Sequence, residues 1–432
     1  MEKVNKYLIL VCLYVGYMNH TYSRRSFQNV INYTMNENFM NTEFIGLIVT
    51  FQQIGYTMCK FVQPFIIDKL NPKIFFSATM FVTCFCLLPF SYAKSFYEFI
   101  SLYWIHGFFL AFAWPSLAKI LKQMIKQKEF GFWWSVQCTS SNLGAVFGAI
   151  ISAFISDRYG WRISILFCAL VNLACAILIS LIFVIVKVPM VGIDRKILEK
   201  LQKHPLTYKS YLTNPILLSN NFMFFCTYVC RYVICDWYQV YLSNLEFPQY
   251  IIAGFLSALE MGGLFGSLVA GIMADYLYIH FPDVKNPRIF VIIICGGLTA
   301  AVLHVLIFSV NSQTTQFLLS SMGFSFGLFI YGPVAVSGIV ALEGAPPDQQ
   351  GMSFSINIIF ANVAMLFTGY PVSFLAKRYG WKLVFLLSYF LICASTAVLI
   401  LFRNFSTPVD SLDLSDAQMP GSTLKLISTP IE

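Results

Sequence analysis

The sequence is poor in charge, because Asp, Glu, Lys and Arg make up only 11% of its 432 residues. A soluble domain carries about 25% of these residues. Hydrophobic residues reach 58%, and the mean hydropathy is +0.70. These values argue against a soluble protein and predict a membrane protein with many spans. The net charge of +8 does not indicate a nucleic-acid partner, because most Lys and Arg lie in short loops.

Several functional signals are also missing. The first apolar run follows only "MEKVNK" and has no small-residue cleavage site, so we interpret it as a span and not as a signal peptide. The twelve Cys show no metal-ligand or disulfide-framework spacing. The motif "GFSFG" (323–327) fits G-x-S-x-G but lies inside an apolar segment, whereas an esterase serine needs a strand–turn–helix setting. We therefore predict no enzyme activity, no catalytic residue, no metal and no cofactor.

Twelve apolar segments alternate with polar loops. They lie near 6–34, 43–68, 73–93, 95–121, 130–156, 162–187, 214–243, 248–276, 288–310, 313–342, 349–376 and 382–403. Their lengths suit helices and not membrane strands. The predicted fold is an all-α membrane protein with twelve transmembrane helices in two pseudo-symmetric six-helix bundles. The predicted domains are residues 1–187, a cytosolic linker at 188–210, residues 211–403, and a disordered cytosolic tail at 404–432.

The distribution of positive charge predicts the orientation. With both termini in the cytosol, the cytosolic loops and termini hold 18 of the 28 Lys and Arg, and the opposite side holds six. Cytosolic loops of membrane proteins carry an excess of Lys and Arg. We therefore expect a multi-pass protein with both termini cytosolic.

The two halves resemble each other in sequence. "AFISDRYGWR" (153–162) matches "SFLAKRYGWK" (373–382) at an offset of 220, and Asn142 falls on Asn362 in the same register. Earlier in the chain the offset is 207, which places Arg24 on Arg231. A parallel repeat of six spans predicts a substrate site near the membrane midplane, between the halves.

Six charged residues lie inside apolar segments and away from their ends. A charge near the bilayer centre costs at least ~2.5 kcal/mol, so each one needs a physical reason. Four are basic and two acidic, a net charge of +2, and they are Arg24, Arg25, Lys60, Arg231, Asp236 and Glu260. Paired guanidinium groups can grip a phosphate with two hydrogen bonds each, which favours a dianionic cargo.

Other interpretations of these charges remain open at the level of the sequence. Asp236 and Glu260 could hold the arginines apart in the empty site, or they could bind hydroxyl groups of the cargo. All six could instead form charge pairs that only join helices. Arg24 alone could reach the membrane interface. His106 and His304 could relay protons or serve as packing residues.

Seven short motifs carry a family resemblance that extends over about residues 8–403. They are "RRSF" (24–27), "CKF" (59–61), "AWPSLAKIL" (113–121), "FGFWWSVQCTSSNLGA" (130–145), "CDWYQ" (235–239), "SALEMGGLFGSLVAG" (257–271) and "YGPVAVSGIVALEGAPP" (331–347). With them the sequence resembles the organophosphate:phosphate antiporters of the major facilitator superfamily. It is most similar to the branch that exchanges glucose 6-phosphate in the endoplasmic reticulum.

The resemblance implies roles for the six ionisable residues. Arg24 and Arg231 would grip the phosphate, and Arg25 and Lys60 would line the same cavity. Asp236 and Glu260 match acidic residues that are linked to the basic pair in bacterial relatives. Bacterial glycerol-phosphate carriers have a histidine where this chain has Ser141, so no histidine role is carried over at that position.

The expected function follows from the cavity and the resemblance together. It is alternating-access exchange of inorganic phosphate for a sugar phosphate, with glucose 6-phosphate as the expected cargo. The alternatives are a proton-coupled carrier of another organic anion and a non-transporting membrane receptor, scaffold or intramembrane enzyme. The expected location is the endoplasmic-reticulum membrane. The plasma membrane is the alternative, because the chain ends "STPIE" without a two-lysine retrieval signal.

Overall fold

The computed structural model describes residues 2–35, 40–67, 71–125, 127–186, 214–281, 284–344 and 350–405, and these residues form helices and short connections without a strand. The first half contains α1 (Glu2–Arg24), a 3-10 turn (Gln28–Val30), α2 (Ile31–Thr34), α3 (Thr42–Ile67), α4 (Pro72–Tyr92), α5 (Phe96–Leu110), α6 (Ala113–Met124), α7 (Gln127–Tyr159) and α8 (Trp161–Ile185). The second half contains α11 (Pro215–Asn244), α12 (Gln249–His280), α13 (Pro287–Phe308), α14 (Gln316–Glu343), α15 (Gln350–Phe367), α16 (Tyr370–Tyr379) and α17 (Trp381–Phe402).

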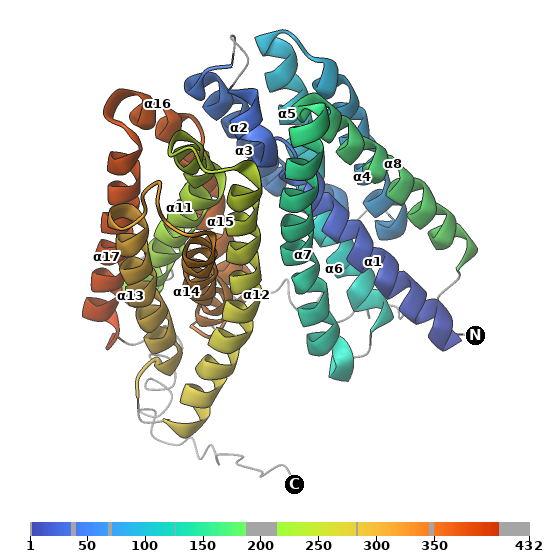
Figure 1. The fold of residues 1–432 in the computed structure, drawn as a ribbon. Coiled ribbons are helices and arrows are strands. Elements are labelled where there is room, and N and C mark those ends of the chain that lie inside the picture. The colour runs from blue at the N-terminus through green and yellow to red at the C-terminus, as the bar shows by residue number, and fades with distance from the viewer. Residues whose placement is uncertain are drawn as a thin grey trace.

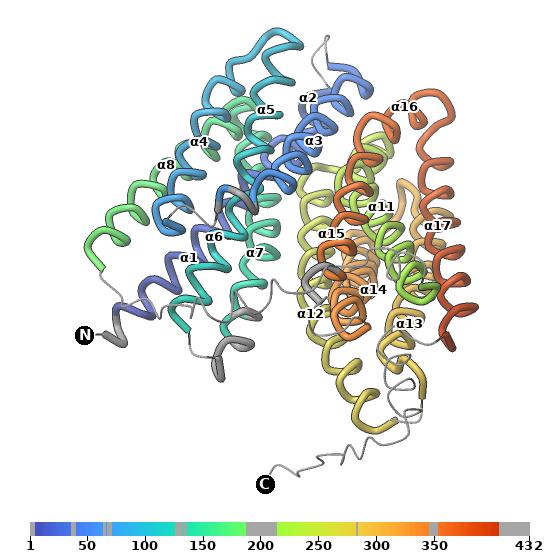
Figure 2. Tube along the Cα trace, turned by 180° about the vertical axis from the view of Figure 1, so that it is seen from behind, coloured from blue at the N-terminus to red at the C-terminus, as the bar shows by residue number. Residues whose placement is uncertain are grey.

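The helices gather into two bundles that stand side by side (Figures 1 and 2). Within the first bundle, α4 packs on α8, α3 on α5 and α1 on α7. Within the second, α12 packs on α14, α11 on α17 and α13 on both α14 and α17. The linker at 188–210 lies outside the described residues, as does the tail from residue 406 onward, so the exact domain boundaries stay a prediction.

Twelve long helical segments are present among the described residues when α5 with α6, and α15 with α16, each count as one crossing. Eight helices are apolar and long enough to span a membrane, and the pair α15 and α16, bent by 40°, makes a ninth. The long helices outside this group are α1, α3 and α11. These three helices carry four of the six predicted site residues, Arg24, Lys60, Arg231 and Asp236.

The turn between the last two spans of each half shows the repeat in the backbone. Gly160 has φ 88° and ψ 160°, and Gly380, 220 residues later, has φ 86° and ψ 161°. Only glycine adopts this positive-φ region without strain. Each turn is followed by a tryptophan that begins the next helix, Trp161 in α8 and Trp381 in α17. The predicted offset of 220 therefore corresponds to the same local structure in both halves.

The bundles touch closely on the face that carries α2 and α16. A Cβ atom on Gly46 would overlap the hydroxyl of Ser373, and one on Gly369 would overlap the hydroxyl of Thr50. The Tyr370 amide donates to Thr50 Oγ1 at 2.6 Å. Because two glycines remove side chains at this crossing, α3 can approach the break between α15 and α16 and close this face.

Gly46→Ala is expected to separate the bundles on the closed face. Alanine favours the helix but places a methyl group against Ser373. The distance between spin labels at the exposed residues Tyr97 and Phe317, one in each bundle, should lengthen. Gly271→Ala is the matched control, because nothing lies within 4 Å of its Cβ position. An unchanged label distance in Gly46→Ala would show that this contact does not hold the face closed.

Candidate functional site

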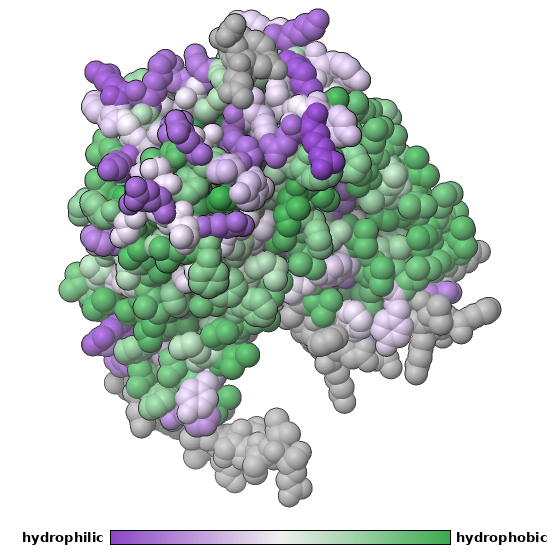
Figure 3. Space-filling view, in the orientation of Figure 1, coloured by the Kyte–Doolittle hydropathy of each residue, from purple (hydrophilic) through white to green (hydrophobic). Residues whose placement is uncertain are grey.

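A cavity of about 670 Å³ lies between the bundles and is lined from both. The surface is hollowed between the bundles on the face where α1 begins, and hydrophobic residues cover much of the outer surface of both bundles (Figure 3). The cavity is therefore enclosed on the α2 and α16 face and open on the opposite face.

Five of the six predicted site residues line this cavity. They are Arg24, Arg25, Lys60, Arg231 and Glu260. Four positive charges and one negative charge give the lining a net charge of +3. The structure therefore brings residues together that are up to 236 positions apart in the sequence.

Asp236 is the exception, because it is buried and does not line the cavity. It lies on α11, five residues after Arg231. Five residues rotate a side chain by about 140° around a helix, so the two side chains leave α11 on different faces. Asp236 is therefore not part of the cavity lining, and its contact with the cargo stays a prediction.

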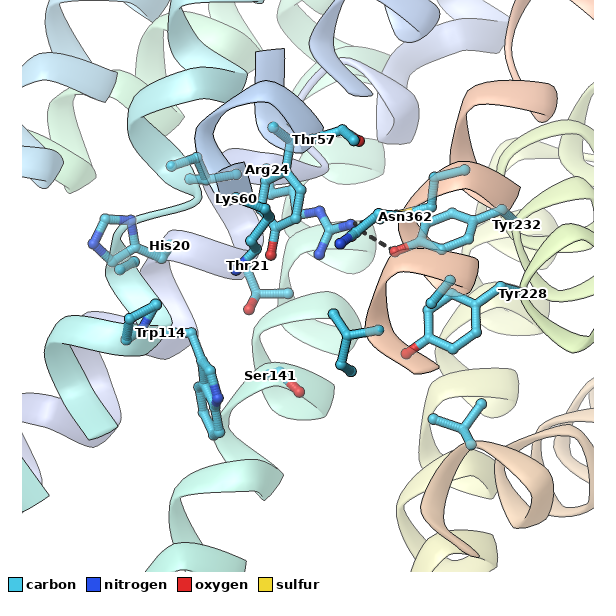
Figure 4. Close-up of a pocket in the computed structure, with 18 of the residues that line it drawn as sticks. His20, Thr21, Arg24, Thr57, Lys60, Trp114, Ser141, Tyr228, Tyr232 and Asn362 are labelled. Carbon is cyan, nitrogen blue, oxygen red and sulfur yellow. Dashed lines mark hydrogen bonds between the residues drawn. The ribbon is translucent and has the colours of Figure 1, made fainter. Parts of the chain in front are cut away.

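Arg24 reaches across the cavity from the last turn of α1. Its Nη2 donates to the hydroxyl of Tyr232 on α11 at 2.6 Å, the dashed line in Figure 4, and approaches Met365 Sδ at 3.3 Å. Its guanidinium carbon lies 4.8 Å from the ring centre of Tyr56. In the described part of the chain, no carboxylate lies within ion-pair distance of Arg24. Its charge therefore faces the cavity without a neutralising partner.

Side chains from other helices hold the end of α1 in place. The carbonyl of Arg24 accepts hydrogen bonds from Gln52 Nε2 at 2.9 Å and from the Tyr103 hydroxyl at 3.2 Å. The Tyr103 hydroxyl also lies 2.8 Å from Gln28 Oε1. A helix end leaves carbonyls without partners, and these donors satisfy one of them. The expected first span of 6–34 was therefore too long, because the helix ends at Arg24 before the short 3-10 turn and α2.

Glu260 joins the other two arginines. Its Oε1 lies 3.0 Å from Arg25 Nη1 and 3.7 Å from Arg231 Nη2. The Tyr331 hydroxyl donates to Glu260 Oε2 at 2.5 Å and accepts a hydrogen bond from Arg231. Glu260 therefore pairs with both arginines and offsets one of their two positive charges. The role of holding the arginines apart stays a prediction for Glu260.

Lys60 is held more loosely than the arginines. Its Nζ lies 3.4 Å from the carbonyl of Ala111 and 5.0 Å from the ring centre of Tyr56. Ala111 belongs to the break between α5 and α6, where the helix pattern is interrupted. One weak hydrogen bond and one ring leave the ammonium group available to an anion.

The tyrosines between these cations were not predicted from the sequence. The guanidinium carbons of Arg24 and Arg231 lie 5.8 Å and 5.3 Å from the ring centre of Tyr232. The Arg231 carbon also lies 4.4 Å from the ring of Tyr331. The repeat offered one signal for Tyr232, because the offset of 207 places Tyr232 at the position equivalent to Arg25. The sequence could not show that this ring lies between the two arginines.

The histidines among the described residues do not form a chain through the cavity. His106 is buried, lies 2.9 Å from the Ser23 hydroxyl and stacks on Tyr103. His304 is exposed on α13, and its ring lies beside those of Phe308 and Tyr389 with the planes tilted by 42° and 54°. Neither lines the cavity, whereas His20 does. The geometry favours the packing interpretation for His106 and His304.

Two helical bundles that enclose a charged cavity, closed on one face and open on the other, define a membrane transporter. The Major Facilitator Superfamily model matches residues 13–368, and the chain belongs to this family. No group of three potential metal-ligating residues occurs among the residues that the structure describes.

Three relatives align over most of their length. The membrane sensor protein UhpC of Escherichia coli (strain K12) is 25% identical over 93% of this chain and 92% of its own. A probable hexose phosphate transport protein of Chlamydia pneumoniae is 25% identical over 92% and 90%. The glycerol-3-phosphate transporter of Bacillus subtilis (strain 168) is 23% identical over 87% of each chain.

Solved structures share the fold at low sequence identity. A bacterial homologue of the human lysosomal transporter Spinster, inward-facing and occupied, superposes with a TM-score of 0.72 at 12% identity, covering 92% of this chain and 97% of its own. A D-xylose–proton symporter gives 0.70 at 13% identity, with coverages of 94% and 98%. At these identities the similarity shows the fold alone.

Proposed function

We propose that this protein exchanges a sugar phosphate for inorganic phosphate by alternating access, with glucose 6-phosphate as the expected cargo. One observation carries the proposal. Arg24 and Arg231 come from equivalent positions of the two halves and approach the same tyrosine ring in one cavity. Such a pair can hold a phosphate between the bundles. The hexose phosphate and glycerol-3-phosphate relatives support this cargo class.

The charge of the cavity gives a reason for obligatory exchange. Four cations and one carboxylate line it, and closing it empty would bury uncompensated positive charge. A phosphate dianion removes most of that charge. The bundles should therefore reorient readily only with an anion bound, which links the outward movement of one anion to the inward movement of another.

Orientation and compartment are part of the same proposal. α1 begins and α17 ends on the face where the cavity is open (Figure 1). With both termini in the cytosol, as the positive loops predict, this state opens to the cytosol. We place the protein in the endoplasmic-reticulum membrane, with 1–187 and 211–403 as the two moving bundles and 188–210 as their cytosolic linker.

The decisive experiment uses purified full-length protein in liposomes. Vesicles loaded with unlabelled phosphate should take up labelled phosphate, and external glucose 6-phosphate should inhibit this uptake and enter in exchange. Vesicles without internal anion should take up little. Uptake driven by a pH gradient without internal phosphate would contradict exchange and favour a proton-coupled carrier. Phosphate binding without counterflow would favour a sensor, the role named for the Escherichia coli relative.

A further inference from the structure

The charged residues occupy only part of the cavity. Its volume of about 670 Å³ is in the range of sites that enclose a drug-sized ligand, so an inorganic phosphate leaves much of it empty. The cations and Glu260 gather around Tyr56, Tyr232 and Tyr331. Whatever distinguishes a sugar phosphate from phosphate must be bound in the rest of the cavity.

An aromatic pair forms the wall of the first bundle beyond Arg24. Tyr17 lies seven residues before Arg24 on α1, which is about 10 Å toward the open face on nearly the same side of the helix. The ring of Trp114 packs on Tyr17, with centres 4.8 Å apart and planes tilted by 57°. Trp114 is the second residue of α6, directly after the break that ends α5. The break turns the chain so that the indole enters the cavity.

Hydroxyl and amide groups surround this pair. Thr21 and Ser141 line the cavity from the same bundle, and Asn362 from the other. The Thr21 hydroxyl donates to the Tyr17 carbonyl and that of Ser141 to the Cys138 carbonyl, so both oxygens keep lone pairs that can accept. Figure 4 shows Trp114 and Ser141 on one side of the open space and Tyr228 on the other.

This arrangement suits a pyranose ring. The C–H groups of a sugar face carry a small positive charge and fit the negative face of an aromatic ring. The hydroxyl groups at the rim of the sugar need polar partners, which Ser141, Thr21 and Asn362 supply. Glycerol phosphate has no ring face to place on the indole, and inorganic phosphate has no carbon at all.

We propose that Trp114, supported by Tyr17, binds the ring of the cargo and sets the preference for hexose phosphates over phosphate and glycerol phosphate. This inference rests on the proposed function and adds a second subsite to it. The phosphate end is held by Arg24, Lys60 and Arg231, and the sugar end lies toward the open face between Trp114 and Tyr228.

The test measures competition against phosphate:phosphate counterflow. In Trp114→Leu, which keeps an apolar side chain without a ring, inhibition by glucose 6-phosphate should weaken about tenfold or more. Inhibition by phosphate and by glycerol 3-phosphate should stay within about twofold. Trp114→Phe, which keeps an aromatic face, should recover most of the loss. Trp104→Ala is the control, because Trp104 lies on α5 outside the cavity lining.

Three results would overturn the inference: an equal weakening for all three anions, an unchanged response to glucose 6-phosphate, or equal behaviour of the Leu and Phe variants. Each presupposes wild-type counterflow. If the wild-type protein shows no counterflow, the proposed function itself fails, so the two failures are distinguishable.

Discussion

Arg24→Ala is expected to abolish phosphate counterflow. Among the described residues no carboxylate lies within ion-pair distance of Arg24, and its Nη2 donates to the neutral Tyr232 hydroxyl at 2.6 Å. Removing one member of a close charge pair costs about 2–5 kcal/mol, which corresponds to a 30- to several-thousand-fold loss of affinity. The loss is measured as the rate of phosphate exchange in liposomes, at a phosphate concentration that saturates the wild-type protein.

Substitution by lysine separates charge from geometry at the same position. Arg24→Lys keeps the charge but loses the planar fork, so we expect weak residual exchange with a raised half-saturating phosphate concentration.

Arg231→Ala should abolish exchange as well, because it removes the second half of the pair. Arg378 is an exposed arginine on α16, and the control variant Arg378→Ala should exchange phosphate at the wild-type rate. Counterflow that survives both alanine variants would refute the phosphate clamp.

Glu260→Gln is expected to impair both stability and exchange. In the wild-type protein the Glu260 carboxylate contacts Arg25 and Arg231, and all three side chains are at most 13% exposed. Breaking a buried pair from one side costs about 3–5 kcal/mol, because the remaining charges lose their partner. The melting temperature of the purified protein should therefore fall. The exchange rate should fall too, because the carboxylate no longer draws the arginines back when the anion leaves.

The effect of phosphate on the melting temperature should distinguish Glu260→Gln from the wild-type protein. An anion that binds the folded state stabilises it, and the variant has one more uncompensated cation to offer. Phosphate should raise the melting temperature of Glu260→Gln more than that of the wild-type protein. Glu246→Gln is the matched control, since Glu246 is exposed in the turn between α11 and α12. Equal phosphate effects in both variants would show that Glu260 does not compete with the anion.

Local sequence patterns were sufficient to predict the class of fold. Hydropathy is a property of consecutive residues, so the expected segments fall close to α3, α4, α7, α8 and the helices of the second half. The repeat was also readable, because the same turn needs glycine at positions 160 and 380. The six intramembrane charges stood out because a membrane interior tolerates few of them.

Positions within the site depended on how the helices rotate and where they break. Hydropathy cannot show that α1 ends at Arg24, because its carbonyl is capped by Gln52 and Tyr103 from other helices. It cannot show that Asp236 is buried outside the cavity lining while Arg231, on the same helix, belongs to the lining.

The sequence by itself determined that this chain is helical, spans a membrane, repeats itself and carries arginine at equivalent places in both halves. Only the tertiary structure decided which charges are paired. Glu260 binds Arg25 and Arg231, whereas Arg24 meets Tyr232. The physical reason is that hydropathy and repeats are read along one chain. Side-chain pairing is set by how helices cross, and two of these contacts, Arg24–Tyr232 and Arg25–Glu260, join residues more than 200 positions apart.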